Sequence, residues 1–193
     1  MSKSMVMVFS VMCVLWVCSA AWGQLEEGVL LEADGKVIDI EVGHLVPVAV
    51  DWNEDGRKDL LVGHDDTIIF YKNIGSKTEY KFAAPKLIEI PEGKFPSRPS
   101  PFVVDWDGDG KKDLLSGGER PVVTFYRNIG AAQEPKLAEG VDLKLTGPEF
   151  DKGYRCRIDV TDWNNDGKPD ILVGNFFSYK KPMGGNIWLF LRK

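Results

Sequence analysis

Cysteine and histidine are scarce in this sequence, and their scarcity excludes several kinds of site. Only three of the 193 residues are cysteine and two are histidine. Cys13 and Cys18 lie in an apolar first segment, so the remainder has only Cys156 and can form no intrachain disulfide. We expect Cys156 to be a small buried hydrophobic residue. His44 and His64 have neither metal-binding nor triad spacing, and no enzyme signature motif is present, which argues against catalysis.

The sequence also lacks a clustered basic stripe and a long helical pattern. Its formal net charge is -5, which argues against a nucleic-acid partner. Beyond the first segment, no long stretch places apolar residues at a period of 3.6, so we expect almost no helix. The composition, 44% hydrophobic and 27% charged, is that of a chain able to bury a core.

The first 23 residues have the layout of a secretory signal peptide. A single positive charge, Lys3, precedes the almost wholly apolar residues 5–17. Small residues, Ala21 and Gly23, then occupy the positions that a signal peptidase reads. The pattern predicts a signal peptide at residues 1–23, cleaved after Gly23.

Two alternatives to cleavage are an uncleaved membrane anchor and a lipoprotein. The apolar segment approaches the length of a short span, but its small-residue end favours cleavage. A lipoprotein would use Cys18, and the bulky Val17 before it disfavours that choice. We therefore expect a mature domain of residues 24–193 that is secreted, extracellular or periplasmic, with no stable membrane span.

A short segment with several aspartates occurs three times. Residues 47–63, 101–117 and 158–174 read PVAVDWNEDGRKDLLVG, PFVVDWDGDGKKDLLSG and IDVTDWNNDGKPDILVG. The interval between copies exceeds one hairpin and suits one four-stranded blade per repeat. The repeats lie near residues 47–100, 101–157 and 158–193.

Further strands follow each copy of this segment. The β-branched and aromatic run at residues 68–75 recurs at 123–130, and both runs end in an Asn-x-Gly turn. Ile187–Arg192 resembles a third copy. Weaker strands are expected around residues 85–90 and 135–143.

The beginning of the mature chain resembles the end of a repeat. Residues 29–40 resemble residues 86–95, an apolar strand followed by an acidic glycine turn. We therefore predict that residues 28–42 form a closing strand, with residues 29–32 pairing with residues 187–191 within one chain or across two. The predicted fold is all-β, with three β-propeller-type blades of four antiparallel strands, the N-terminal strand closing the last blade.

Each repeated segment contains the pattern D-x-(D/N)-x-D-G-x-x-D, which suits calcium. Calcium takes six to eight oxygen ligands from a loop that curls around it. Side chains at positions one, three and five can converge on one ion, and glycine at position six permits the turn. Position seven offers its backbone carbonyl, with its charged side chain directed outward, and the aspartate at position nine closes the cage. The predicted ligands are Asp51, Asn53, Asp55, Arg57 and Asp59; Asp105, Asp107, Asp109, Lys111 and Asp113; and Asp162, Asn164, Asp166, Lys168 and Asp170.

Other readings of these loops are weaker. An EF-hand or dockerin requires an acidic ligand at position twelve, which here is Val62, Ser116 or Val173. Aspartate-rich and glycine-rich segments can also be simple turns. Three such segments in register on a common period argue against that alternative.

Together these motifs resemble the FG-GAP/VCBS repeats of the integrin-α-type β-propeller family. The resemblance covers roughly residues 28–193 and includes the aspartate loop, the Asp-Trp pair, the Asp-Leu-Leu-Val-Gly run and the Asn-x-Gly strand end. The Phe-Gly…Gly-Ala-Pro signature is absent, so the VCBS branch is closer. The resemblance implies blades stabilised by calcium bound between the first two strands, with asparagine tolerated at position three.

Two further groups of residues have a functional and a structural interpretation. Trp52, Trp106 and Trp163 could stack on sugars, but their fixed place in the repeat favours packing between blades. Arginines before the second and third loops could bind an anion, although ion-paired side chains are the simpler interpretation. They are Arg98, Arg155 and Arg157, with Tyr154 beside them.

The sequence thus predicts a non-catalytic, calcium-dependent binding or adhesion module. Its ligand would be an extracellular protein or a carbohydrate, and self-association is a further expectation. Two alternatives stay open. The chain could accompany or form part of a polysaccharide-degrading enzyme, or it could be a fragment of a larger propeller, since three blades fall short of the usual four to eight.

Overall fold

The computed structural model describes residues 25–41, 44–179 and 181–193. The predicted signal peptide at residues 1–23 lies outside this part of the chain. Every described element is a β-strand except η1, a 3-10 turn at Phe150–Lys152. This confirms the expected all-β class with almost no helix. Within the described residues, no helix has the length and apolarity needed to cross a membrane.

Three antiparallel sheets correspond to the three repeats. The first contains β3 (Val46–Val50), β4 (Asp59–His64), β5 (Thr67–Tyr71) and β6 (Lys86–Leu87), in that order. The second contains β7 (Ser100–Val104), β8 (Asp113–Gly117), β9 (Thr124–Tyr126) and β10 (Val141–Asp142). The third contains β11 (Tyr154–Thr161), β12 (Asp170–Phe177) and β13 (Gly184–Phe190). Four strands per blade is therefore confirmed for two repeats, whereas the third blade has three described strands.

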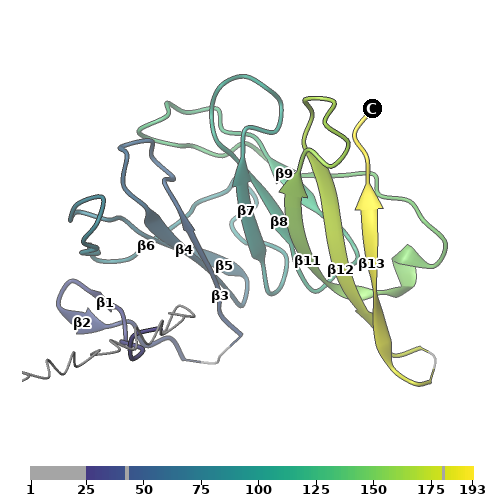
Figure 1. Ribbon diagram of the computed structural model, residues 1–193, viewed down its shortest axis with the longest axis horizontal. Helices are drawn as coiled ribbons and strands as arrows, with labels where there is room; N and C mark the ends of the chain where they lie inside the picture. Colours follow the sequence, from purple (N-terminus) through teal and green to yellow (C-terminus); the bar gives the residue numbers. More distant parts are fainter. Residues whose placement is uncertain (1–24, 42–43, 180) are drawn as a thin grey trace, which may run out of the picture.

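The three blades stand side by side in an open arc, and none of the sheets formed by the described residues closes into a ring (Figure 1). The first strands β3, β7 and β11 run in the same direction, so the loops that follow them reach one common rim. The register repeats as well. Leu60 of β4 pairs with Tyr71, and Leu114 of β8 pairs with Tyr126. Residues at corresponding register positions can therefore be compared between blades.

The hydrophobic core lies between neighbouring blades. One cluster joins Trp52, Leu61 and Ile68 of the first blade to Leu114 and Tyr126 of the second. A second cluster joins the opposite face of the second blade to the third, and the buried Cys156 belongs to it. Burial raises the pKa of the Cys156 thiol to about 11, so the sulfur is a neutral apolar group, as predicted.

The N-terminal segment folds differently from the prediction. It forms a hairpin of β1 (Glu32–Ala33) and β2 (Lys36–Val37), closed by Asp34 and Gly35 at φ 50° and 71°. Positive φ at both turn residues is the requirement of a tight type I′ hairpin. Ala33 also bridges Phe82 and packs on the outer face of the first blade.

The predicted pairing of this segment with the last blade within one chain is therefore wrong. In the described chain β13 pairs only with β12, and β1 lies at the opposite end of the arc (Figure 1). The physical reason is visible in the linker between the first two blades. Its Phe95 packs edge-on against Tyr126 of the blade that follows, with ring centroids 5.1 Å apart. The N-terminal segment likewise packs on the blade that follows it.

Candidate metal centres

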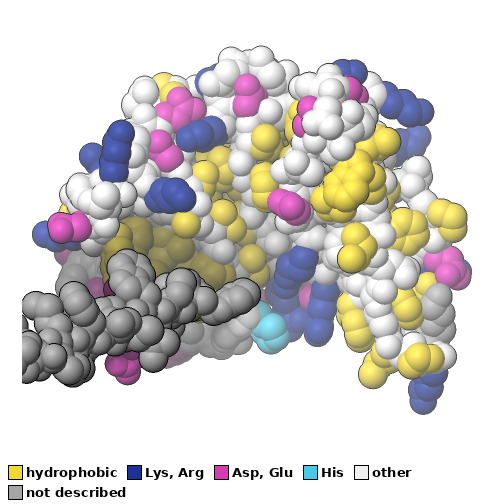
Figure 2. All heavy atoms as spheres, in the orientation of Figure 1, with side chains coloured by type: hydrophobic (Ala, Val, Ile, Leu, Met, Phe, Trp, Pro, Cys, Tyr) yellow, Lys and Arg dark blue, Asp and Glu magenta, His cyan; other side chains and the backbone are white. Residues whose placement is uncertain are grey.

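The three aspartate loops lie on one rim of the molecule. Each connects the first and second strands of its blade, and Figure 2 shows acidic side chains distributed along this upper margin. The position-six glycines adopt left-handed φ values of 83°, 85° and 83°, as the sharp turn requires. They are Gly56, Gly110 and Gly167.

The first aspartate of each loop curls the backbone around its carboxylate. Asp51 Oδ1 accepts the Asp55 N–H at 3.0 Å, and Oδ2 accepts the Gly56 N–H at 2.9 Å. Asp162 repeats this arrangement with the same two distances in the third loop. In the second loop Asp105 accepts the Gly110 N–H at 2.9 Å. The three loops therefore share one backbone course, as their sequences predict.

The second loop brings three carboxylates together. One oxygen each from Asp105, Asp107 and Asp109 lies within 4.8 Å of the other two. Across the described ranges this is the one such group of three acidic ligand atoms. Arg127 Nε lies 2.6 Å from an Asp107 oxygen, and Lys111 Nζ lies 3.4 Å from an Asp109 oxygen. Positive charge thus already gathers where the carboxylates converge.

The first loop also pairs its acids with cations. Asp55 lies 2.6 Å from the Arg57 guanidinium and 3.7 Å from Lys72 Nζ. Desolvation alone would raise the pKa of Asp55, but hydrogen bonds from Asn53 and the Arg57 backbone, with the charges of Arg57 and Lys72, lower it overall. In the third blade Leu191 occupies the place of Lys72, so this cation is replaced by an apolar side chain.

In the first two loops the side chains at position seven do not point outward, contrary to the expectation. Arg57 reaches across its loop and donates from Nε to the Asn73 carbonyl at 2.9 Å. Lys111 donates to the Asn128 carbonyl at 2.8 Å. Each therefore ties its loop to the end of the third strand. Both long side chains can also satisfy loop carboxylates, and this local pairing decides their direction.

The aspartates at position nine are the most deeply buried acids of the loops. Asp59, Asp113 and Asp170 are at most 1% exposed. Asp113 Oδ2 accepts the Trp106 N–H at 2.9 Å, and Oδ1 accepts the Asn128 N–H at 2.7 Å. Asp59 and Asp170 make the equivalent pairs of bonds. Each carboxylate therefore joins the start of its loop to the end of the third strand.

This second role of position nine was not predicted from the sequence. Burial raises the pKa of the Asp59 and Asp113 carboxyls, although the backbone hydrogen bonds oppose the shift. Asp113 lies outside the cluster formed by the other three acids of its loop. Each carboxylate oxygen can accept more than one bond, so the aspartate at position nine can keep these hydrogen bonds and also contact a bound ion.

The Asn-x-Gly turns have a structural function that sequence reasoning noted only as strand ends. The buried Asn128 accepts the N–H groups of Gly130 and Lys136 at 2.9 and 3.1 Å. Asn73 does the same for Gly75 and Lys81. The asparagine therefore folds the chain back toward the fourth strand.

The arginines before the loops converge on one carboxylate at the opposite rim. Arg98 lies 3.1 Å and Arg155 lies 3.6 Å from oxygens of Glu119. These contacts support the interpretation of ion-paired side chains. Arg157 lies nearby, and desolvation, with repulsion from Arg155 and Arg98, lowers the pKa of its guanidinium.

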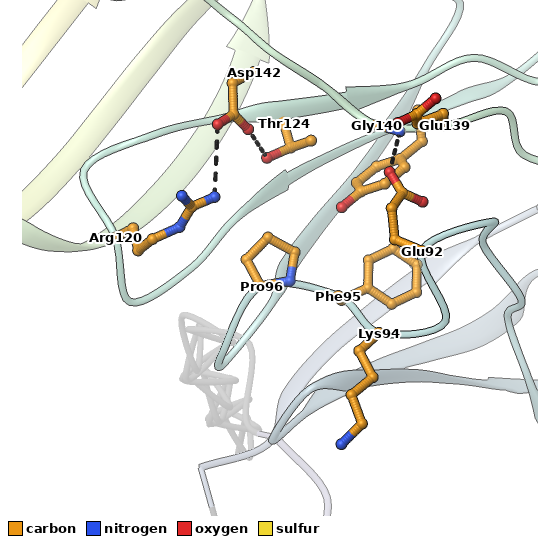
Figure 3. A pocket seen from close by; sticks show the side chains of 10 residues that line it. Glu92, Lys94, Phe95, Pro96, Arg120, Thr124, Glu139, Gly140 and Asp142 are labelled. Atoms are coloured by element: carbon orange, nitrogen blue, oxygen red, sulfur yellow. Dashed lines mark hydrogen bonds and ion pairs between the residues drawn. The ribbon is translucent and has the colours of Figure 1, made fainter.

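A cavity of about 530 Å³ opens between the linker at residues 92–96 and the second blade (Figure 3). Asp142 accepts the Thr124 hydroxyl at 2.7 Å and lies 3.6 Å from Arg120, while Glu92 accepts the Gly140 N–H at 2.5 Å. Its charged groups are of both signs, and Arg120 and Asp142 pair with each other. The cavity is therefore a mixed polar hollow without a preference for one charge.

The donor set of the loops fits a calcium ion. Three oxygens of the second loop already converge, the glycine turn has the required φ, and the nearby cations mark a place that favours positive charge. Carboxylate, amide and carbonyl oxygens are the ligands that calcium prefers. Residues at positions one, three, five, seven and nine would hold it, and the ion would supply charge neutralisation and rigidity.

Comparison with family sequence profiles gave a match. The sequence profile of the FG-GAP-like repeat matches residues 51–116 and 105–173, which together cover more than half of the chain. A search of curated proteins found no similar sequence. Each matched segment begins at the aspartate loop of one blade and ends within the second strand of the next, so it includes two of the three loops.

Proposed function

This chain belongs to the FG-GAP-like repeat family, and from that premise we propose its function. We propose that the protein is a secreted, calcium-stabilised binding module without catalytic activity. Repeats of this family are generally interaction or adhesion modules. The ligand we propose is an extracellular protein or a carbohydrate. The observation that carries the proposal is the placement of three equivalent aspartate loops on one rim.

Calcium would act on the loops by replacing their internal ion pairs. The carboxylates of Asp107 and Asp109 are held by Arg127 and Lys111, which are flexible and partly exposed. A divalent ion bound among the carboxylates would free these side chains for contacts at the rim. A rim whose loops are held rigid binds a partner at a smaller entropic cost. The metal therefore serves structure and recognition.

The second loop should bind calcium most tightly. It has four carboxylates at the ligand positions, Asp105, Asp107, Asp109 and Asp113, against three at those positions in each of the other loops, and more ligand charge raises affinity. We place its dissociation constant at roughly 10⁻⁴ M, the lower edge of the range for extracellular modules. At a calcium concentration 100 times that value, one site adds about 2.7 kcal/mol to the free energy of unfolding.

Denaturant unfolding with and without calcium tests this proposal. Calcium should stabilise the wild-type protein, and Asp109→Ala should remove the part of the stabilisation that appears at the lowest calcium concentration. Asp55→Ala and Asp166→Ala are matched controls, since each removes the same loop position from a weaker site. Magnesium at equal concentration controls for ionic strength. If a control variant removes the low-concentration phase instead, the charge-count argument fails. If calcium has no effect on stability, the proposed function fails.

A binding assay separates the proposed module from an enzyme. The protein should bind to an extracellular protein or polysaccharide array in calcium and dissociate when the calcium is chelated. Depolymerisation of a polysaccharide by the purified protein would instead support the alternative of a polysaccharide-degrading activity.

A further inference from the structure

The contact between successive blades is built in the same way twice. Gly63 lies on the second strand of the first blade, and a Cβ added there would lie 2.0 Å from the Pro99 carbonyl oxygen. Gly117 has the same place in the second blade, and its Cβ would lie 2.5 Å from the Cys156 carbonyl oxygen. Each glycine therefore admits backbone from the next blade: Pro99 directly precedes β7, and Cys156 lies near the start of β11.

The third blade has the same glycine without a neighbour. Gly174 occupies the corresponding position of β12, but a Cβ there would meet only the Arg157 carbonyl of its own blade, at 4.0 Å. The segment before β3 of the first blade corresponds to the backbone that packs on these glycines, and it too has no neighbouring blade in the described chain. Leu45 precedes β3 as Pro99 precedes β7, yet it is 42% exposed, whereas Pro99 is fully buried.

The third blade exposes large apolar side chains at positions that form the core between the other blades. Trp163 is 57% exposed, whereas the equivalent Trp52 is 4% exposed between blades. Ile187 is 83% exposed, whereas the equivalent Ile68 is wholly buried. Figure 2 shows hydrophobic side chains gathered on the surface of this third blade. An exposed apolar patch of this kind marks an interaction surface.

We propose that the open face of the third blade binds a second copy of this chain, through the surface around Leu45 on that copy's first blade. We choose a second copy because the two internal contacts each join the same two kinds of face. The third blade exposes one of these faces and the first blade exposes the other, so two copies can form the same contact between them. Within one chain these halves lie at opposite ends of the arc and do not meet (Figure 1). The contact is head to tail, and two copies joined at both ends give six blades, within the usual range for a propeller.

The N-terminal segment adds a second element to this contact. Val29 and Leu30 are exposed and lie just before β1. In the alignment of residues 29–40 with residues 86–95, they correspond to Lys86 and Leu87, which form β6, the fourth strand of the first blade. They can supply a fourth strand to β13, whose outer edge has no described partner. Asp159 of β11 is polar where the equivalent Phe102 is apolar, so the contact is centred on β12 and β13.

Sedimentation velocity tests the association. The wild-type protein should form a dimer, whereas Ile187→Asp and Leu45→Asp should each weaken self-association at least tenfold. Val141→Asp is a matched control, because it places the same charge on an exposed β10 residue outside both faces. All three side chains are exposed, so circular dichroism should show unchanged folding. A wild-type monomer at every concentration, or a continuing series of larger polymers, would overturn the closed dimer.

Mixing the variants tests the head-to-tail geometry. Ile187→Asp keeps the surface around Leu45 intact, and Leu45→Asp keeps the face of the third blade intact. An equimolar mixture should therefore form a heterodimer through one undamaged contact, although each variant alone is monomeric. If Leu45→Asp alone dimerises as the wild type does, the copies meet face to face and the proposal is wrong.

Discussion

Gly117→Val should lower the free energy of unfolding by about 3 kcal/mol, the upper part of the range for overpacking a closely packed site. A Cβ at this position would lie 2.5 Å from the Cys156 carbonyl oxygen and 3.2 Å from Ile158 Cγ2, so the second and third blades would have to move apart. The nearest obstacle is backbone, which cannot turn away as a flexible side chain can. Denaturant unfolding at low protein concentration measures the loss.

Gly174→Val is the matched control for this substitution. It changes the same residue type at the corresponding strand position, where the added atoms meet only a distant carbonyl. Valine also suits a strand better than glycine does. We expect a change of at most about 0.5 kcal/mol in the monomer. Equal losses in the two variants would contradict the account of the glycines as sites of contact between blades.

Asp113→Ala should cause a loss of similar or larger size, even without metal. It leaves the part-buried N–H of Trp106 and the buried N–H of Asn128 without their acceptor, and each unsatisfied donor shielded from water costs about 1–3 kcal/mol. The combined loss is therefore about 2–6 kcal/mol, with unfolding measured in a chelator so that calcium contributes nothing. Because both bonds join separate segments, the variant should loosen the whole second blade.

Asp107→Ala separates this structural role from metal binding. Asp107 is an exposed acid of the same loop, and its main contact is with the Arg127 side chain. In chelator its removal should cost less than about 1 kcal/mol, because it supports no buried donor. In calcium it should abolish most of the stabilisation by the second site. An Asp113→Ala protein as stable in chelator as the wild type would refute the structural role.

The period-two strands and the aspartate loops could be predicted from the sequence because both depend on local order along the chain. The run that became β5 and the loop glycine Gly110 are examples, since their side-chain alternation and left-handed φ follow from neighbouring residues. The third copy of the strand was predicted at 187–192 and is found as β13. Local periodicity was sufficient for these elements.

Features that depend on distant partners could not be predicted in this way. The two hydrogen bonds of Asp59 join residues 7 and 14 positions away, and only the folded blade brings Asn73 to the carboxylate. The sequence of the N-terminal segment resembles the linker before the second blade, and this resemblance led to the prediction of a closing strand. The predicted partner, the last blade, was wrong. The segment packs on the first blade, which follows it in the chain, just as Phe95 of the linker packs on Tyr126 of the second blade.

Calorimetric titration of the protein with calcium tests the central claim most directly. If the three loops are metal sites, the protein binds about three ions, one per loop, and the second site fills first. Asp113 and its equivalents already order the loops, so a large conformational change need not accompany binding. A stoichiometry of three supports the account. A stoichiometry of zero or one would contradict it, and the loops would then be turns tied by their own aspartates.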